Sequence, residues 1–343
     1  MLKSPAASRR FLCSAGFAGS IRPIAVRCQT DLPQRSEAIL NKRIFRLVAA
    51  LLALALLCAC GQSTQPSKEK TENFTPYSIP AFADSVFQAD QATAAGCAQV
   101  DLSQLDSGIV GVKAQSDTKL KFQIVQGEQK YNYDLPGNGT PTFYPLNMGS
   151  GSYTFRLMEQ VEENKYTCSW SQECTVSLLD EFQPFLRPSQ LVDYSENSAC
   201  VQKARELAAD CSEDSEVAAA VYDLLVNNIR YDKQKAETVQ SGYLPDPDET
   251  LSSKKGICFD YAALAAAMLR SMGIPCKLIT GYVGENTYHA WNSFYLKNSG
   301  WITVEFKVNA NEWQRVDITF AAGGGLPDAG SKSGIQYTTR YTY

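Results

Sequence analysis

The pattern of apolar and polar positions changes about halfway along the chain. Between residues 108 and 178, short runs alternate apolar and polar side chains, as in Leu120, Phe122 and Ile124. A period of two residues is typical of strands with one buried face. With glycine-rich turns between them, such runs predict strands at 108–114, 119–127, 130–135, 142–146, 152–161 and 166–178. This spacing predicts a small β-sandwich over residues 79–185, immunoglobulin-like in shape.

After residue 195 the period becomes that of a helix. Spacings of i, i+4, i+7, i+8 and i+12 place one apolar stripe on a helix through Val217, Val221, Leu224, Leu225 and Ile229. The pattern predicts helices at 197–210, 214–230 and 256–273, and then strands at 277–283, 289–296, 301–306 and 314–320. Gly273 and Pro275 end the third helix. Helices followed by an antiparallel sheet indicate an α+β domain over residues 186–343.

The N-terminal region has the layout of a secretory signal. Basic residues at 42, 43 and 46 precede the apolar run 47–59, which is too short for a comfortable transmembrane span of about 20 residues. The run ends in Leu-Cys-Ala-Cys at 57–60, which resembles the lipobox of bacterial lipoproteins. That resemblance implies that residues 40–59 are removed and that Cys60 carries lipid. The alternatives are an uncleaved anchor and a signal without lipidation.

Two further segments are set apart from the folded body. Residues 1–39 are basic and lack apolar periodicity, so we interpret them as a mis-called start or a leader. Residues 60–78 are polar and predict a flexible tether. Together with the lipobox, this order predicts a chain on the extracytoplasmic side of a bacterial membrane, held there through its lipid.

The net charge and the cysteine content limit the kinds of partner, metal site and disulfide that we expect. Without residues 1–59, the chain has 23 basic and 34 acidic residues, a net charge of −11, so we expect no nucleic-acid partner. The sequence has eleven cysteines, no Cys-x-x-Cys pair and one histidine, so we expect no metal site. Outside the cytosol some cysteines could pair. The local candidates are Cys168 with Cys174 and Cys200 with Cys211.

Three residues in a fixed order point to chemistry. Cys258 falls at the start of the third predicted helix, where the macrodipole and free N–H groups favour a thiolate and lower the pKa of a thiol. His289, the one histidine of the chain, follows on a predicted strand, and Asp317 lies on a later strand. We expect histidine and aspartate on adjacent strands. A thiol, an imidazole and a carboxylate that orients the ring are the parts of a cysteine nucleophile site.

Residues 195–343 resemble the transglutaminase-like superfamily of papain-type cysteine enzymes. The resemblance is carried by three blocks: KKGICFDYAALAAAMLRSMGIPCKLITGY at 254–282, YHAWNSFY at 288–295, and GW at 300–301 with VDITFA at 316–321. It implies a papain-like core of helices and antiparallel sheet. It also implies that Cys258 is the nucleophile, His289 the general base and acid, and Asp317 the orienting group, with Asp260 and Glu305 as the other candidate carboxylates.

The resemblance implies attack on an amide carbonyl, of a glutamine side chain or a peptide bond, through a thioester. The substrate would be a protein or peptide, no cofactor is expected, and transamidation and hydrolysis stay open. The Cys258 N–H would hold the oxyanion with a second donor, for which Tyr231 and Trp291 are candidates. The competing hypothesis is a binding or structural lipoprotein that uses the same scaffold without catalysis.

Overall fold

The computed structural model describes residues 74–284, 287–309, 312–317 and 337–343. The predicted leader, the signal, Cys60 and most of the predicted tether lie outside the described residues. The described chain from Thr75 onward belongs to one compact unit. Within these ranges, no helix has the length and apolar character that a membrane crossing requires.

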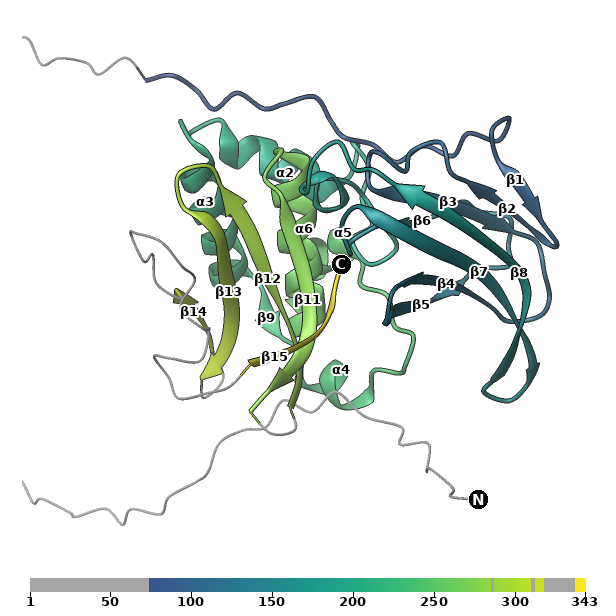
Figure 1. Cartoon of the computed structure of the whole chain (residues 1–343). Helices are drawn as coiled ribbons and strands as arrows, with labels where there is room; N and C mark the ends of the chain where they lie inside the picture. The colour runs from purple at the N-terminus through teal and green to yellow at the C-terminus, as the bar shows by residue number, and fades with distance from the viewer. Residues whose placement is uncertain (1–73, 285–286, 310–311, 318–336) are drawn as a thin grey trace, which may run out of the picture. The chain divides into compact units, whose positions relative to one another are not determined.

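The first half of the described chain forms two four-stranded antiparallel sheets (Figure 1). One has the order β1-β2-β3-β6, with β1 at Thr93–Ala95, β2 at Ala98–Asp101, β3 at Ile109–Ala114 and β6 at Thr142–Pro145. The other has the order β5-β4-β7-β8, with β4 at Leu120–Gln126, β5 at Gln129–Leu135, β7 at Gly151–Glu162 and β8 at Lys165–Val176. All six predicted strands are confirmed, and β1 and β2 are additional. The immunoglobulin-like arrangement of the two sheets stays a prediction.

Aromatic side chains join these two sheets. The alternation predicted for β4 is present, because Leu120, Phe122 and Ile124 are buried. The Phe122 ring stacks on Tyr144 of β6 at 5.3 Å between centroids, so a residue of the second sheet packs directly on one of the first. Burial of one such side chain contributes about 1.5–3 kcal/mol to stability, which explains how short strands hold together.

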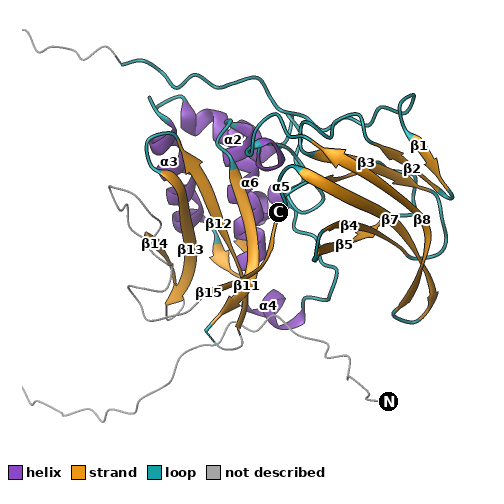
Figure 2. Ribbon diagram, viewed as in Figure 1, coloured by secondary structure: helices purple, strands orange, loops and turns teal. Residues whose placement is uncertain are grey.

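The second half is the predicted α+β unit, in which helices gather on one side of a sheet (Figure 2). A 3₁₀ turn at Gln183–Phe185 leads to α2 at Ala199–Ala208, α3 at Asp214–Asn228, α4 at Lys233–Thr238, α5 at Pro247–Ser253 and α6 at Cys258–Ser271. A short parallel pair joins β9 (Arg230–Tyr231) to β10 (Lys255–Gly256). The three predicted helices are confirmed as α2, α3 and α6, whereas α4 and α5 were not predicted.

The large sheet is antiparallel, with the order β14-β13-β12-β11-β15. Its strands are β11 at Cys276–Val283, β12 at Thr287–Leu296, β13 at Gly300–Asn309, β14 at Glu312–Asp317 and β15 at Tyr337–Thr342. The four predicted strands correspond to β11–β14, and β15 was not predicted. Residues 318–320, the end of the last predicted strand, lie outside the described residues.

Helix α6 is the centre of this unit, and all fourteen of its residues are buried. Its one basic residue, Arg270, is 2% exposed. The Arg270 guanidinium donates to three backbone carbonyls, those of Cys276 at 2.8 Å, Arg187 at 2.9 Å and Tyr343 at 2.9 Å. Burial lowers the pKa of Arg270, but a guanidinium stays protonated at any ordinary pH. One buried side chain thus ties α6 to β11, to the chain before α2 and to the residue after β15.

The predicted local disulfides are wrong. Cys168 and Cys174 lie six residues apart on the same strand, β8, which separates them by about 20 Å. Cys200 is at the start of α2 and Cys211 lies beyond its end, so the helix alone places about 12 Å between them. A disulfide needs Cα atoms within about 7 Å. None of the seven cysteines in the described part of the chain belongs to a disulfide.

Candidate active site around Cys258

Cys258 is the first residue of α6, as the sequence predicts, and is 2% exposed. Ile257 precedes it in extended backbone at the N-cap position. Asp260 turns back, and its carboxylate accepts the N–H of Ile257 at 2.8 Å. A Cβ on Gly256 would stand 2.8 Å from the Cβ of Asp260, which is closer than such atoms approach. Glycine at 256 therefore allows Asp260 to close the first turn around Cys258.

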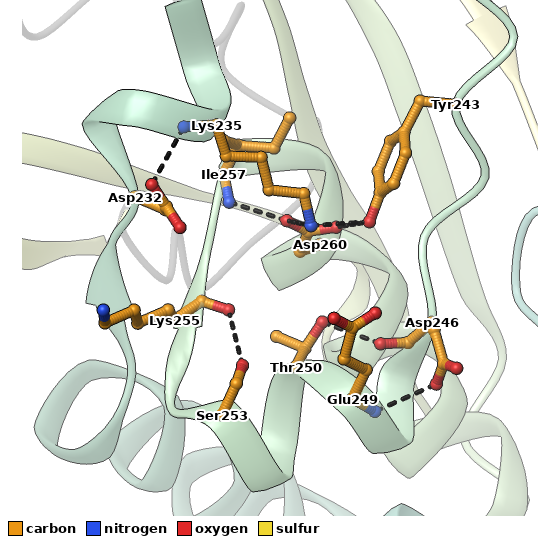
Figure 3. A network of polar contacts seen from close by, with 10 residues as sticks. All are labelled: Asp232, Lys235, Tyr243, Asp246, Glu249, Thr250, Ser253, Lys255, Ile257 and Asp260. Atoms are coloured by element: carbon orange, nitrogen blue, oxygen red, sulfur yellow. Dashed lines mark hydrogen bonds and ion pairs between the residues drawn. The ribbon is translucent and has the colours of Figure 1, made fainter. Parts of the chain in front are cut away.

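Asp260 is the centre of a polar cluster that fixes this turn (Figure 3). Its carboxylate is fully buried and accepts a hydrogen bond from the Tyr243 hydroxyl at 2.6 Å. The Lys235 ammonium pairs with it at 2.8 Å and lies 4.5 Å from the centre of the Tyr243 ring. Burial raises the pKa of Tyr243, and the adjacent Asp260 carboxylate raises it further, so the phenol stays a donor. With these three partners, Asp260 organises the cysteine turn and is a poor candidate for the group that orients His289.

The chain just before α4 is bound to the same turn. The Asp232 N–H donates to the carbonyl of Gly256 at 2.9 Å, and the Asp232 side chain accepts the N–H of Lys235 at 2.9 Å at the start of α4. In the short parallel pair, Tyr231 is opposite Gly256. Tyr231, a predicted candidate for the second oxyanion donor, thus lies beside the turn that precedes Cys258. That role stays a prediction.

His289 lies on β12 opposite Gly281 of β11 and is 6% exposed. Alternation along β12 places Trp291 on the same face, where its ring meets Tyr337 at 5.6 Å between centroids. A Cβ on Gly281 would stand 2.1 Å from the carbonyl oxygen of Thr338 and 2.9 Å from the Trp291 ring. Glycine at 281 therefore lets β15 and the Trp291 ring come close to the strand beside His289.

A side-chain bond relates the cysteine helix to the histidine strand. Asn292, on the opposite face of β12 from His289, donates to the carbonyl of Ala262 at 2.9 Å. Further along α6, Arg270 bonds Cys276, which is paired with Phe294 of β12. Helix and strand therefore run in the same direction. Cys258 precedes Ala262 by one turn, and His289 precedes Asn292 by three residues, so both lie toward the same end of the layer. The pairing of thiol and imidazole stays a prediction.

The third predicted residue, Asp317, is the last residue of β14 and is paired with Val304 of β13. Val304 is in turn paired with Asn292 of β12. The expectation that histidine and aspartate occupy adjacent strands is therefore wrong, because β13 lies between them. Strand β13 spans Gly300–Asn309 and pairs antiparallel with β14, which places Asp317 on the outer strand. The side chains of Asp317 and Glu305 lie outside the described residues, so the orienting role stays a prediction.

Among the described residues, no three side chains of the metal-ligating kinds gather as a metal site requires. Lys235 and Tyr243 support the cysteine turn from a segment with no apolar periodicity, so the sequence pattern did not predict them. The signal that was available is Asp260 itself, an acidic residue in the first turn of an apolar helix.

Comparison with known proteins supports the family resemblance. Residues 201–318 match the model of the transglutaminase-like superfamily. An uncharacterised protein of Mycobacterium leprae is 26% identical over 190 residues, 52% of this chain and 63% of that protein. A UPF0252 protein of Methanocaldococcus jannaschii is 27% identical over 154 residues, 40% of this chain and 42% of that protein. The chain thus spans about half the length of these curated relatives.

Solved structures are similar at a lower level. A protein of Cytophaga hutchinsonii, provisionally named a cysteine protease, is 15% identical, with a TM-score of 0.34 over 67% of this chain and 80% of its own. Red sea bream transglutaminase is 14% identical, with a TM-score of 0.25 over 57% of this chain and 47% of its own. Likenesses of this size carry no information about the reaction. Residues 201–318, which include the blocks around Cys258 and His289, therefore match the core of the transglutaminase-like superfamily.

Proposed function

We propose that this chain is a transglutaminase-like cysteine enzyme that attacks amide carbonyls through a thioester. The observation that carries the proposal is Cys258 at the start of α6, in a first turn closed by the buried Asp260 carboxylate. Backbone N–H groups at a helix start are free to stabilise a thiolate and, later, an oxyanion. The match of residues 201–318 to the superfamily supports the same chemistry.

In the proposed reaction, the Cys258 thiolate adds to the amide carbonyl and forms a C–S bond. The C–N bond then breaks, His289 gives its proton to the leaving amine, and the acyl group stays on sulfur as a thioester. A second nucleophile closes the cycle by displacing the thiolate. Water gives hydrolysis and an amine gives transamidation, and His289 accepts the proton in either case. Asp317 is proposed to orient the imidazole.

The proposal is tested by the rate at which iodoacetamide alkylates Cys258 at pH 6. A free thiol has a pKa near 8.5 and is almost wholly protonated there, so an activated Cys258 should react at least about tenfold faster. Peptide mapping by mass spectrometry assigns the modified residue. Cys258→Ala should remove the fast reaction, whereas Cys168→Ala, at an exposed cysteine of β8, should leave it unchanged.

A rate for Cys258 no greater than that of a free thiol would contradict the enzyme proposal and favour a binding or structural protein. If the fast reaction is present, incorporation of a labelled amine into casein indicates transamidation. Release of peptides from the same substrate indicates hydrolysis.

We also propose that the eight N-terminal strands form an immunoglobulin-like sandwich. We further propose that Cys60 anchors the chain to the outer side of a bacterial membrane. The lipobox-like run at 57–60 supports the anchor. Cells expressing the chain should incorporate labelled palmitate into it, and Cys60→Ser should abolish the label and release the protein from the membrane fraction. Equal labelling of the two proteins would exclude this anchor.

A further inference from the structure

A pocket of about 390 Å³ lies beside the proposed site. Phe259, the residue after Cys258, and Tyr288, the residue before His289, both line it. Its opposite wall comes from the N-terminal sheets, through side chains of β4 and β5 that include Tyr133 and Asp134. The N-terminal strands therefore take part in a cavity that reaches the two residues flanking the proposed catalytic pair.

The charges in this pocket do not balance. Lys121 and Asp134 form an ion pair at 2.5 Å and neutralise each other. Arg340 of β15 is the remaining charged side chain of the lining, and no carboxylate in the described part of the chain forms an ion pair with it. Its guanidinium donates to the hydroxyl of Tyr282 at 3.1 Å, which leaves further N–H groups for a ligand. Among the described residues, the pocket thus offers one positive charge that no carboxylate pairs with.

The rest of the lining suits a peptide. The Tyr282 and Tyr288 rings meet edge to face at 5.3 Å, and Phe259 and Tyr243 add further aromatic surface. Aromatic faces bind the apolar parts of a ligand. Amide side chains can pair with peptide groups, and the pocket contains three, those of Asn132, Gln190 and Gln240.

We propose that this pocket binds a peptide carboxylate of the substrate and that Arg340 is the residue that selects for it. The inference rests on the proposed function, because the bound peptide is the acyl donor whose amide reaches Cys258. An arginine pairs with a carboxylate through two parallel hydrogen bonds, which adds geometric selectivity to charge. The carboxylate is either a chain terminus or an acidic side chain close to the reacting amide.

Equilibrium binding to the full chain carrying Cys258→Ala tests the proposal without turnover. One probe pair is acetyl-Gln-Gly and its C-terminal amide, and a second pair is acetyl-Gln-Gly-Asp-amide and acetyl-Gln-Gly-Asn-amide. In at least one pair the carboxylate form should bind about tenfold tighter, and the pair that responds identifies the source of the carboxylate. Calorimetry or intrinsic fluorescence provides the affinities.

Adding Arg340→Gln should abolish the preference, and Arg340→Lys should retain part of it. Lys130→Gln, at an exposed cation of β5 outside this pocket, should keep the preference in full. Equal affinities within both pairs, or a preference unchanged by Arg340→Gln in a variant with normal thermal unfolding, would overturn the inference. Both outcomes are independent of Cys258 alkylation, so a fast-reacting Cys258 with no carboxylate preference leaves the proposed function standing. An unreactive Cys258 with an Arg340-dependent preference instead indicates a peptide-binding protein.

Discussion

Replacing Arg270 by methionine should lower the free energy of unfolding by about 3–5 kcal/mol. Methionine has a similar length and fills the apolar surroundings, so the expected loss comes from hydrogen bonding. The carbonyls of Cys276, Arg187 and Tyr343 would each lose their guanidinium donor. The Tyr343 carbonyl would keep the Leu278 N–H as a donor at 2.8 Å, whereas a buried polar group left without any partner costs about 1–3 kcal/mol. Urea denaturation followed by circular dichroism measures the change.

Two other variants separate this effect from the loss of charge. Arg270→Lys keeps the charge, but one ammonium cannot reach three carbonyls that a planar guanidinium spans, so it should also destabilise. Arg205→Met removes an arginine from α2 that pairs with the exposed Glu196 at 2.9 Å, and it should change stability by no more than about 1 kcal/mol. Equal unfolding free energies for Arg270→Met and Arg205→Met would show that the buried network is not stabilising.

Replacing Asp260 by alanine should have a comparable effect on stability, about 3–5 kcal/mol, and should also slow alkylation of Cys258. Removal of one member of a buried ion pair leaves its partner without compensation, here the Lys235 ammonium. The Tyr243 hydroxyl and the Ile257 N–H lose their acceptor as well. Because Ile257 precedes Cys258, the first turn of α6 should loosen. Chemical denaturation and the iodoacetamide rate at pH 6, measured in folded protein, report the two effects.

The matched control is Glu206→Ala, which breaks the exposed pair with Lys203 on α2 and should change neither quantity appreciably. Tyr243→Phe removes two hydrogen bonds of the cluster, the one that the hydroxyl donates to Asp260 and the one that it accepts from Lys235. It keeps the ion pair, so a loss of about 1–3 kcal/mol is expected. If folded Asp260→Ala alkylates Cys258 at the unchanged rate, Asp260 stabilises the fold without positioning the thiol.

Local patterns in the sequence predicted the elements with strong periodicity. Alternation identified β4 and β7, and Gly273 with Pro275 correctly marked the end of α6. Strands β1 and β2 were missed because Thr-Ala-Ala and Ala-Gln-Val-Asp show no alternation of large apolar side chains. Strand β15 was missed for a related reason, since Tyr-Thr-Thr-Arg-Tyr-Thr contains no aliphatic side chain and forms a strand through its pairing with β11.

In the candidate site, too, local features could be predicted from the sequence and tertiary contacts could not. Position in a helix is a local property, so the placement of Cys258 could be predicted from its neighbours. The partners of Asp260 could not, because Tyr243 and Lys235 belong to an irregular segment that tertiary packing brings to the helix start. The three carbonyls that accept from Arg270 could not be predicted either, because they belong to residues far away in sequence or beyond the end of α6. The order of β12, β13 and β14 follows from the pairing of β13 with both neighbours, which the sequence pattern did not distinguish.

Strand β15 has a consequence for how the molecule behaves among other copies of itself. It covers one edge of β11, whose residues 278–281 are buried, and it presents the exposed Thr338, Thr339 and Arg340 to solvent. An uncovered edge of an apolar strand offers unpaired N–H and C=O groups to any other strand it meets. Because β15 occupies that position with a polar, charged segment, the sheet presents there an edge that resists intermolecular β-pairing. The same six residues that supply Arg340 to the pocket thus also protect the chain against aggregation.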